Sequence, residues 1–324
     1  MCPNEYYSLL DLAAQCSSRW KEFMVWVSMT CMRYLFSKAD DMSNVDVLEL
    51  FPTTWAKDAM DPTRYGLLDN TKAARLFPRY VYHNGNPDFA QFNIDWSRVT
   101  HYDLNETCEE TETFLNLLRF SPLLESCKFH MYCGSRLTPN RPVPFVVHQN
   151  LRHLSFTAFL DNNTSSIFAT TTLPSLTHLV IDVISNSSAN PYDGPEFSEV
   201  MAKFSQRSSH PLRKLEFKLA YFASTFTEVD PILKCLSLIN HLCISTRGSW
   251  CRLDLLFLRL THKWTSDDSN NGSAPFLPSL QTLEFHIIDA GRSYIFPWHY
   301  TFDMFGSLSP TMNTNDPARR PLKT

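Results

Sequence analysis

Two nearly identical segments constrain the fold of this chain more than any other feature of its sequence. LPSLTHLVID occupies residues 173–182, and LPSLQTLEFH occupies residues 277–286, 104 residues further on. Reduced to apolar positions, both give L-x-x-L-x-[LIF], with anchors at positions 0, +3 and +5. The spacing recurs seven times, which indicates a repeat architecture. The seven anchor sets are Val99/Tyr102/Leu104, Leu124/Cys127/Phe129, Leu151/Leu154/Phe156, Leu176/Leu179/Ile181, Leu212/Leu215/Phe217, Ile239/Leu242/Ile244 and Leu280/Leu283/Phe285.

Two weaker copies precede this series, at Val45/Leu48/Leu50 and Phe77/Tyr80/Tyr82. The intervals between the first anchors of the seven clear copies are 25, 27, 25, 36, 27 and 41 residues. The two long intervals contain polar, turn-forming inserts, SNSSANPYDGPEF at 185–197 and TSDDSNNGSAP at 265–275. Without these inserts the period returns to about 25 residues, which is typical of leucine-rich repeats.

Stretches with helical spacing of apolar residues lie between the strand-like copies. The spacing predicts helices over 108–120, 194–206, 227–238 and 252–260, and a single helical turn around Ile167 and Phe168. A strand, a helix and a return in each repeat predict an α/β protein with an irregular leucine-rich-repeat solenoid fold. In this open horseshoe, parallel strands form the concave face and helices form the convex face.

Anchors +3 and +5 should point inward, so Leu154, Leu179 and Leu215 should stack in one sheet. The conformational entropy lost in ordering some 25 residues costs more free energy than the burial of three anchors contributes, so one repeat alone should not fold. The expected organisation is an N-terminal helical or capping region over 1–44, the solenoid over 45–290 with clear repeats from about residue 95, and a C-terminal cap with a disordered tail over 291–324.

The composition excludes several classes of protein. With 44% hydrophobic and 19% charged residues, the chain has ample material for a core. A net charge of −4 does not indicate nucleic-acid binding. The nine cysteines contain no C-x-x-C pair, and such a scattered set is typical of small buried hydrophobic residues in a reducing compartment. No signal peptide is visible, and the apolar run over 23–36 is too short to span a bilayer. We expect a cytoplasmic or nuclear monomer that binds neither membrane nor nucleic acid.

The repeats, taken together, resemble a known family: the F-box proteins with irregular leucine-rich repeats that are expanded in mushroom-forming fungi. The likeness extends over most of residues 16–288. It is carried by CSSRWKEF (16–23), DWSRVTHYDL (95–104), FLNLLRFSPLLESCKF (114–129), LRHLSF (151–156), LPSLTHLVI (173–181), SSHPLRKLEF (208–217) and FLPSLQTLEF (276–285).

The resemblance implies an open solenoid that grips a target protein, the substrate-binding part of an F-box-type ubiquitin-ligase receptor. In that family an N-terminal F-box binds the ligase adaptor. No L-P-x-E-[IL] opening precedes Cys16 in this sequence. The adaptor is therefore expected as a partner only if an F-box exists upstream.

Positions +2, +4 and +6 of each strand should face opposite to the buried anchors, on the concave recognition surface. These positions are mostly polar and mixed in charge, which suits a polar protein or peptide partner. The candidate partner-binding residues are His101, Asp103, Lys128, His153, Ser155, His178, Asp182, Lys214, Glu216, Lys218, His241, Glu284 and His286.

Six of the eleven histidines fall on this face. A pH-responsive or metal-binding ladder is one interpretation, and solvent-facing or partner-contacting strand residues are the other. A zinc site needs ligands that converge, whereas a flat column presents them in line, so no metal site is predicted. Trp20, Trp26, Trp55 and Trp96 are interpreted as core or capping groups, with an exposed binding anchor as the alternative.

We find no G-x-S-x-G, H-E-x-x-H, Walker or G-x-G-x-x-G motif, so the chain is predicted not to be an enzyme and to use no cofactor. The predicted function is non-catalytic protein recognition. Two alternatives stay open. One is a secreted or surface leucine-rich glycoprotein, because N-x-[ST] sequons occur at Asn105, Asn162, Asn163, Asn186 and Asn271. The other is an enzyme with an unrecognised site.

Overall fold

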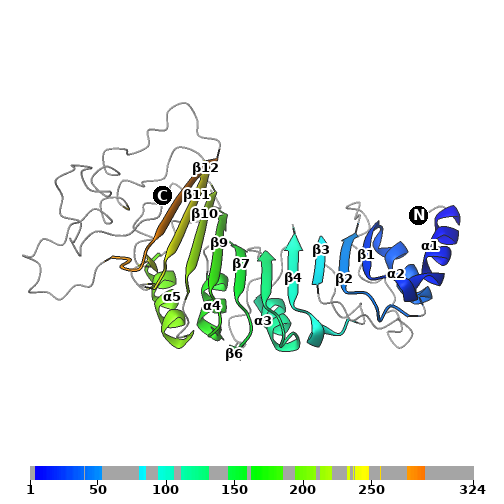
Figure 1. Cartoon of the computed structure of the whole chain (residues 1–324), viewed down its shortest axis with the longest axis horizontal. Helices are drawn as coiled ribbons and strands as arrows, with labels where there is room; N and C mark the ends of the chain where they lie inside the picture. Colours follow the sequence, from blue (N-terminus) through cyan, green and yellow to red (C-terminus); the bar gives the residue numbers. More distant parts are fainter. Residues whose placement is uncertain are drawn as a thin grey trace, which may run out of the picture. The chain divides into compact units, whose positions relative to one another are not determined.

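The computed structural model of the chain divides it into two compact units, described separately below. Unit 1 comprises Met1–Tyr132 with His148–Leu151, and unit 2 comprises Cys133–Val147 with Arg152–Thr324. The structure describes residues 4–39, 41–52, 80–84, 94–105, 111–130, 145–158, 162–184, 194–208, 212–220, 232–233, 236, 238–247, 256 and 276–288. Strands are parallel throughout the described pairings of both units and alternate with helices, as an α/β protein requires (Figure 1).

Unit 1 contains five parallel strands in the order of the chain. They are β1 (Glu22–Val27), β2 (Val47–Pro52), β3 (Tyr80–Asn84), β4 (His101–Asn105) and β5 (Ser126–His130). The helical elements are α1 (Asn4–Gln15), η1 (Ser17–Arg19), α2 (Met29–Lys38), η4 (Trp96–Arg98) and α3 (Thr111–Phe120).

Unit 2 contains five further parallel strands, again in chain order. They are β7 (His153–Ala158), β9 (His178–Ile184), β10 (Lys214–Ala220), β11 (His241–Arg247) and β12 (Thr282–Ile288). The helices are α4 (Asn162–Thr170) and α5 (Gly194–Ser208), and the two-residue strands β6 (Val146–Val147) and β8 (Thr171–Thr172) pair with each other.

The predicted inward anchors form the core. Every first anchor from Val99 to Leu280 is at most 3% exposed, and so are the +3 and +5 anchors of β4, β5, β7, β9, β10 and β11. On β12, Leu283 and Phe285 are only half-buried. The register stacks the +3 anchors as predicted, because Leu179 pairs with Leu154 on one side and with Leu215 on the other.

A repeated turn precedes seven of the described strands and explains why the first anchor is apolar and buried. The backbone N–H of the first anchor donates to the carbonyl three residues earlier, at 3.0–3.2 Å, in the turns that end at Trp20, Val45, Val99, Leu124, Leu176, Ile239 and Leu280. Before β7 a side chain replaces the carbonyl: Leu151 N–H donates to Nδ1 of His148 at 3.1 Å. Nε2 of the same ring lies 2.9 Å from the carbonyl of Ser121 and donates to it.

A second repeated contact joins successive rungs within each unit. The carbonyl of the +1 residue accepts two N–H groups, those of positions +1 and +2 of the next rung, at 2.7–3.2 Å. Thr177 shows both roles, because its N–H donates to Arg152 and its carbonyl accepts from Arg213 and Lys214. The accepting residues are Lys21, Thr100, Arg152, Thr177, Arg213 and Asn240.

Helices form where amphipathic spacing predicted them, and their aromatic residues pack against the strand anchors. Phe114 of α3 contacts Phe129 of β5, with ring centroids 5.2 Å apart. In unit 2, Phe168 of α4 contacts both Phe156 of β7 and Phe204 of α5, at 5.9 and 5.2 Å. Both helices of unit 2 therefore lie on the side of the sheet that carries the anchors.

Three details differ from the sequence prediction. The helix predicted as a single turn is α4, nine residues long. A strand, β1, lies inside the region 1–44 that was expected to be helical or capping, and it pairs with β2. The weak copy Phe77/Tyr80/Tyr82 is off by one residue, because Val81 pairs with Leu48 and Tyr102 and is 2% exposed. A shift of one residue exchanges the two faces of a strand.

Other predictions lie partly or wholly outside the described residues. Of the predicted helices over 227–238 and 252–260, only buried Ile232, Leu233, Leu236 and Leu256 and exposed Leu238 are described. Residues 291–324 lie outside the described residues altogether.

Among the cysteines, Cys127 and Cys243 are buried free thiols as expected, and Cys16 is a half-buried one. Cys31 is disulfide-bonded and contradicts the expectation of thiols only.

Candidate functional site: the polar face of the sheet

All thirteen candidate partner-binding residues lie on described strands, at positions that alternate with the buried anchors. Because successive side chains of a strand point to opposite faces, these residues lie on the face turned away from the helices. In each unit, this surface of the sheet is called the polar face below. Unit 1 contributes His101, Asp103 and Lys128, and the other ten candidates belong to unit 2.

In unit 1, the register brings together one ion pair of the polar face. Asp103 of β4 is aligned with Lys128 of β5, and the Lys128 Nζ–Asp103 Oδ1 distance is 3.3 Å. Both side chains remain partly accessible to solvent, so the pair is worth at most about 1 kcal/mol. His101 is exposed, and its Nδ1 lies 2.9 Å from Oγ1 of Thr100.

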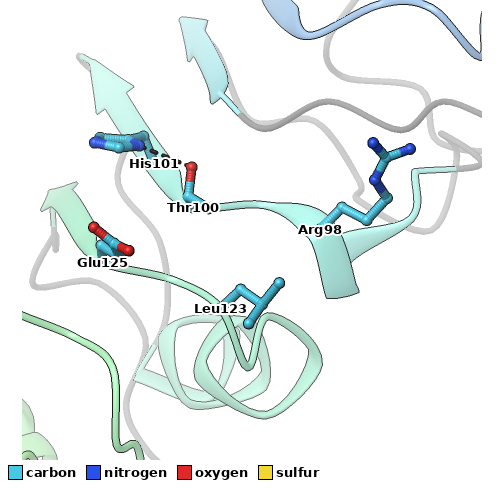
Figure 2. A pocket seen from close by; sticks show the side chains of 5 residues that line it. All are labelled: Arg98, Thr100, His101, Leu123 and Glu125. Atoms are coloured by element: carbon cyan, nitrogen blue, oxygen red, sulfur yellow. Dashed lines mark hydrogen bonds between the residues drawn. The ribbon is translucent and has the colours of Figure 1, made fainter.

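A shallow hollow of about 330 Å³ lies beside His101, lined also by Arg98, Thr100, Leu123 and Glu125. Figure 2 shows that the side chains of Arg98 and Glu125 lie at different sides of this hollow. The hollow is lined by side chains of both charges together with the apolar Leu123.

In unit 2, nitrogen-bearing side chains form a row across four neighbouring strands at position +2. The register aligns His153 with His178, His178 with Lys214, and Lys214 with His241. The rings of His153 and His178 stack, with centroids 4.2 Å apart and an interplanar angle of 22°. We call these four residues the nitrogen row.

His178 is the most perturbed member of this row. The pKa of His178 is lowered to about 4, first by burial and then by the neighbouring His153, Lys214, His241 and Lys218, in that order. Its Nε2 atom is buried and has no hydrogen-bond partner among the described residues. The ammonium groups of Lys214 and Lys218 make this part of the surface electropositive, so a carboxylate or another anionic group of a partner would be attracted to it.

Positions +4 and +6 of the central strands carry both acidic and basic side chains. Glu216 and Lys218 of β10 form an ion pair with an Nζ–Oε1 distance of 3.6 Å. Asp182 of β9 is aligned with Lys218, and Ser155 of β7 is aligned with Val180, which is buried. Ser155 and Asp182 are half-buried. The centre of the polar face therefore combines one buried apolar side chain with charges of both signs.

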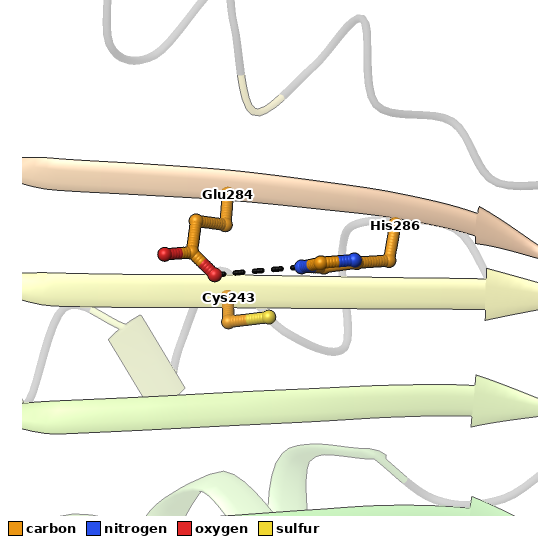
Figure 3. Close-up of side chains that lie close together, drawn as sticks. All are labelled: Cys243, Glu284 and His286. Atoms are coloured by element: carbon orange, nitrogen blue, oxygen red, sulfur yellow. Dashed lines mark hydrogen bonds and ion pairs between the residues drawn. The ribbon is translucent and has the colours of Figure 1, made fainter. Parts of the chain in front are cut away.

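At β11 and β12 the polar face gathers histidine, cysteine and glutamate side chains. Nε2 of His286 lies 3.4 Å from Oε2 of Glu284, and Nε2 of His241 lies 3.2 Å from Oε1 of the same carboxylate. Cys243 of β11 is aligned with Glu284 of β12. Figure 3 shows Cys243, Glu284 and His286 facing one another from the two strands.

The environment of this group shifts two pKa values in opposite directions. Burial raises the pKa of the Cys243 thiol, and the Glu216 carboxylate adds to the increase. The hydrogen bond from His286 lowers the pKa of Glu284. Cys243 is thus a protonated, 4% exposed thiol next to an ionised carboxylate. Such a thiol is a poor nucleophile, because the thiolate is the reactive form.

Sequence reasoning missed an apolar part of the polar face, on β1 of unit 1. Met24 and Trp26 alternate with the buried Phe23 and Val25 and are 63% and 66% exposed. Trp26 contacts Phe51 of β2, with ring centroids 4.4 Å apart. The interpretation of Trp26 as a core group is therefore wrong. Trp20, Phe23 and Val25 have the 0, +3 and +5 spacing of the repeat. This spacing places Trp26 at +6, opposite to the buried anchors, and it could have predicted the exposure of Trp26.

Trp20 and Trp96 agree better with the predicted packing. Trp20 is half-buried and stacks on Phe23 at 4.6 Å, and Trp96 makes an edge contact with Tyr102 at 6.2 Å. Trp55 lies outside the described residues.

Comparison of the chain with protein-family models, with curated proteins and with solved structures finds no match to any of them. Among the helices that the structure describes, none combines the length and the apolar character needed to cross a membrane.

Proposed function

We propose that this chain is an irregular leucine-rich-repeat solenoid that binds a protein partner through the polar face of its sheet. Three observations support the repeat assignment: the buried 0, +3 and +5 anchors, the turn before seven of the described strands, and the carbonyl that accepts from two N–H groups of the next rung. Each recurs in both units. A repeat of one supersecondary unit with parallel strands is the signature of this architecture.

The single observation that carries the binding proposal is the nitrogen row of unit 2. The row aligns the ammonium group of Lys214 with three imidazoles, and the lowered pKa of His178 reflects its burial next to these neighbours. Nε2 of His178 has no hydrogen-bond partner among the described residues. A partner that brings a carboxylate to this row supplies the missing charge and hydrogen-bond acceptor. The partner is therefore a protein or peptide with acidic side chains.

Two further features, one in each unit, provide specificity. The Glu216–Lys218 pair presents both charges next to the row, so a partner needs complementary charges in a fixed order. In unit 1, Trp26 and Met24 are exposed, and exposed aromatic residues are common anchors of protein interfaces.

The test is a triple charge reversal on β10, Lys214→Glu, Glu216→Lys and Lys218→Glu. We expect it to abolish capture of the natural partner and to leave the melting temperature unchanged, because the three side chains are on the surface and the anchors are untouched. A matched control, Arg152→Glu, changes the charge of an exposed residue next to β7 and should bind normally. Capture that survives the triple reversal would show that the polar face is not the binding surface.

The ubiquitin-ligase role is a narrower proposal and rests on the resemblance to F-box proteins. Co-purification of the ligase adaptor with the full-length gene product tests it. Absence of the adaptor would leave a binding protein without a ligase function.

The disulfide at Cys31 favours a second candidate, a secreted or surface leucine-rich glycoprotein. Disulfides persist mainly in oxidising compartments, and the sequons would be glycosylated there. Endoglycosidase treatment of the native protein distinguishes the two: a shift in electrophoretic mobility supports the secreted form, and unchanged mobility supports the intracellular one.

A further inference from the structure

The side chains around Glu284 have the composition of a transition-metal site. Cys243, Glu284 and His286 each offer one ligand atom, and these three atoms lie within 4.8 Å of one another. Thiolate, carboxylate and imidazole are the three donor types that Zn²⁺ accepts in proteins. Mixed sulfur and nitrogen donors also separate such a site from calcium or magnesium sites, which use oxygen ligands.

The separations fit a tetrahedral ion. Two ligand atoms at 2.0–2.1 Å from the same tetrahedral ion are roughly 3.3–3.4 Å apart. The distance between Glu284 Oε2 and His286 Nε2 is 3.4 Å. The other separations in the group are at most 4.8 Å, and rotation about side-chain torsions shortens them toward the tetrahedral value.

His241 lies next to the group. Its Nε2 is 3.2 Å from Glu284 Oε1 and pairs with that carboxylate. The other oxygen of the carboxylate, Oε2, faces His286. His241 therefore helps to orient the Glu284 carboxylate, as outer partners of a metal ligand do.

The arrangement also differs from the flat column that made a metal site unexpected from the sequence. Cys243 comes from β11, whereas Glu284 and His286 come from β12. The three side chains face one another from two neighbouring strands and do not follow one line (Figure 3). We propose that Cys243, Glu284 and His286 bind a Zn²⁺ ion that ties β12 to β11.

The proposal does not depend on the proposed function, because the residues of the charge-reversal test are not among the three ligands. Lys214 and Glu216 lie on β10, next to the site. Loss of the metal with retained partner binding would leave the recognition proposal intact. Loss of partner binding with retained metal would likewise leave the metal-site proposal intact.

The test is metal binding to the full-length chain after removal of metals with a chelator. Zn²⁺ affinity is measured by competition with a chromogenic chelator, and Co²⁺ serves as a spectroscopic probe. We expect one ion per chain that is lost in Cys243→Ser, together with the thiolate-to-cobalt absorption band. His286→Gln and Glu284→Gln should weaken Zn²⁺ binding by more than about tenfold, since even outer partners of a ligand contribute that much.

Controls separate this site from ions bound elsewhere in the chain. His101→Gln and Cys16→Ser remove an exposed histidine and a half-buried thiol of unit 1 and should leave affinity and stoichiometry unchanged. Glu284→Gln keeps the shape of the side chain, so it reports on binding even if Cys243→Ser perturbs folding. Wild-type Zn²⁺ affinity in Glu284→Gln and His286→Gln, or a Co²⁺ spectrum without a thiolate band, would overturn the proposal.

Discussion

His178 is held in its neutral form by the residues around it. Burial disfavours the charged imidazolium, and His153, Lys214, His241 and Lys218 face the same ring with positive or potentially positive charge. His148 is neutral for a related reason: burial lowers its pKa, and its Nδ1 must stay unprotonated to accept from Leu151. Two histidines of this chain thus behave as uncharged hydrogen-bonding or stacking groups near neutral pH.

The pKa of His178 predicts a pH-dependent stability. The unfolded chain takes up a proton near pH 6.5, whereas the folded chain does so only near pH 4, so the free energy of unfolding falls as the pH decreases between these values. The shift would correspond to about 3 kcal/mol, and partial exposure of the ring reduces this to about 1–3 kcal/mol. Urea unfolding at pH 7 and pH 4, with a chelator present, measures the loss.

The variant His178→Gln isolates this effect, because the carboxylates that titrate near pH 4 are common to both proteins. We expect the wild type to lose about 1–3 kcal/mol more than the variant over the same interval. Equal losses in the two proteins would mean that His178 titrates normally in the folded state.

At the scale of the element, three features recur along the described strands: a turn, an apolar alternation and a shared carbonyl. The turn positions the first anchor, the alternation selects the buried face, and the carbonyl of the +1 residue sets the register to the next strand. β9 shows all three, with Leu176 in the turn, Leu179 and Ile181 in the core, and Thr177 between the rungs.

Truncation of a central anchor should therefore be costly. Leu179 is fully buried between Leu154 and Leu215, so Leu179→Ala should lower the free energy of unfolding by about 2–5 kcal/mol. Urea denaturation monitored by circular dichroism measures this change. Arg152→Ala, an exposed change one rung earlier, should stay within about 0.5 kcal/mol of the wild type. A similar small effect of Leu179→Ala would contradict the stacked-anchor core.

At the scale of the whole molecule, the repeats support one another, because each rung is covered by its neighbours. Phe168 of α4 contacts residues of β7 and α5, and Leu215 of β10 is aligned with anchors on β9 and β11. In the described parts of both units, residues of neighbouring rungs help to bury the anchors of each rung. Stability therefore depends on the series of contacts between neighbours.

A single repeat is accordingly expected to be unfolded. The fragment 173–211 contains β9 and α5, yet it lacks the neighbours that bury Leu179 and Phe204. Circular dichroism should show little helix and no cooperative thermal transition, whereas the full chain should melt cooperatively. A fragment with a sharp melting transition would show that the repeats are independent domains.

The sequence predicted seven strands correctly because an alternation of apolar and polar residues is a local property. It failed where the alternation was ambiguous. Around β3, Tyr80, Val81 and Tyr82 are all apolar or aromatic, so either face could be chosen, and the pairing of Val81 with Leu48 and Tyr102 decided it. In β1, the spacing of Trp20, Phe23 and Val25 was present, but only the pairing with β2 identifies a strand.

For β4, β5, β7, β9, β10, β11 and β12, the amino-acid sequence by itself determined which residues are anchors and which form the polar face, because strand periodicity requires nothing beyond neighbours in the chain. Only the tertiary structure decided which polar residues meet. Cys243 and Glu284 are 41 positions apart, and the stacking of His153 on His178 spans 25 positions. Such contacts depend on the register between strands and on the length of the intervening inserts, which no local pattern specifies.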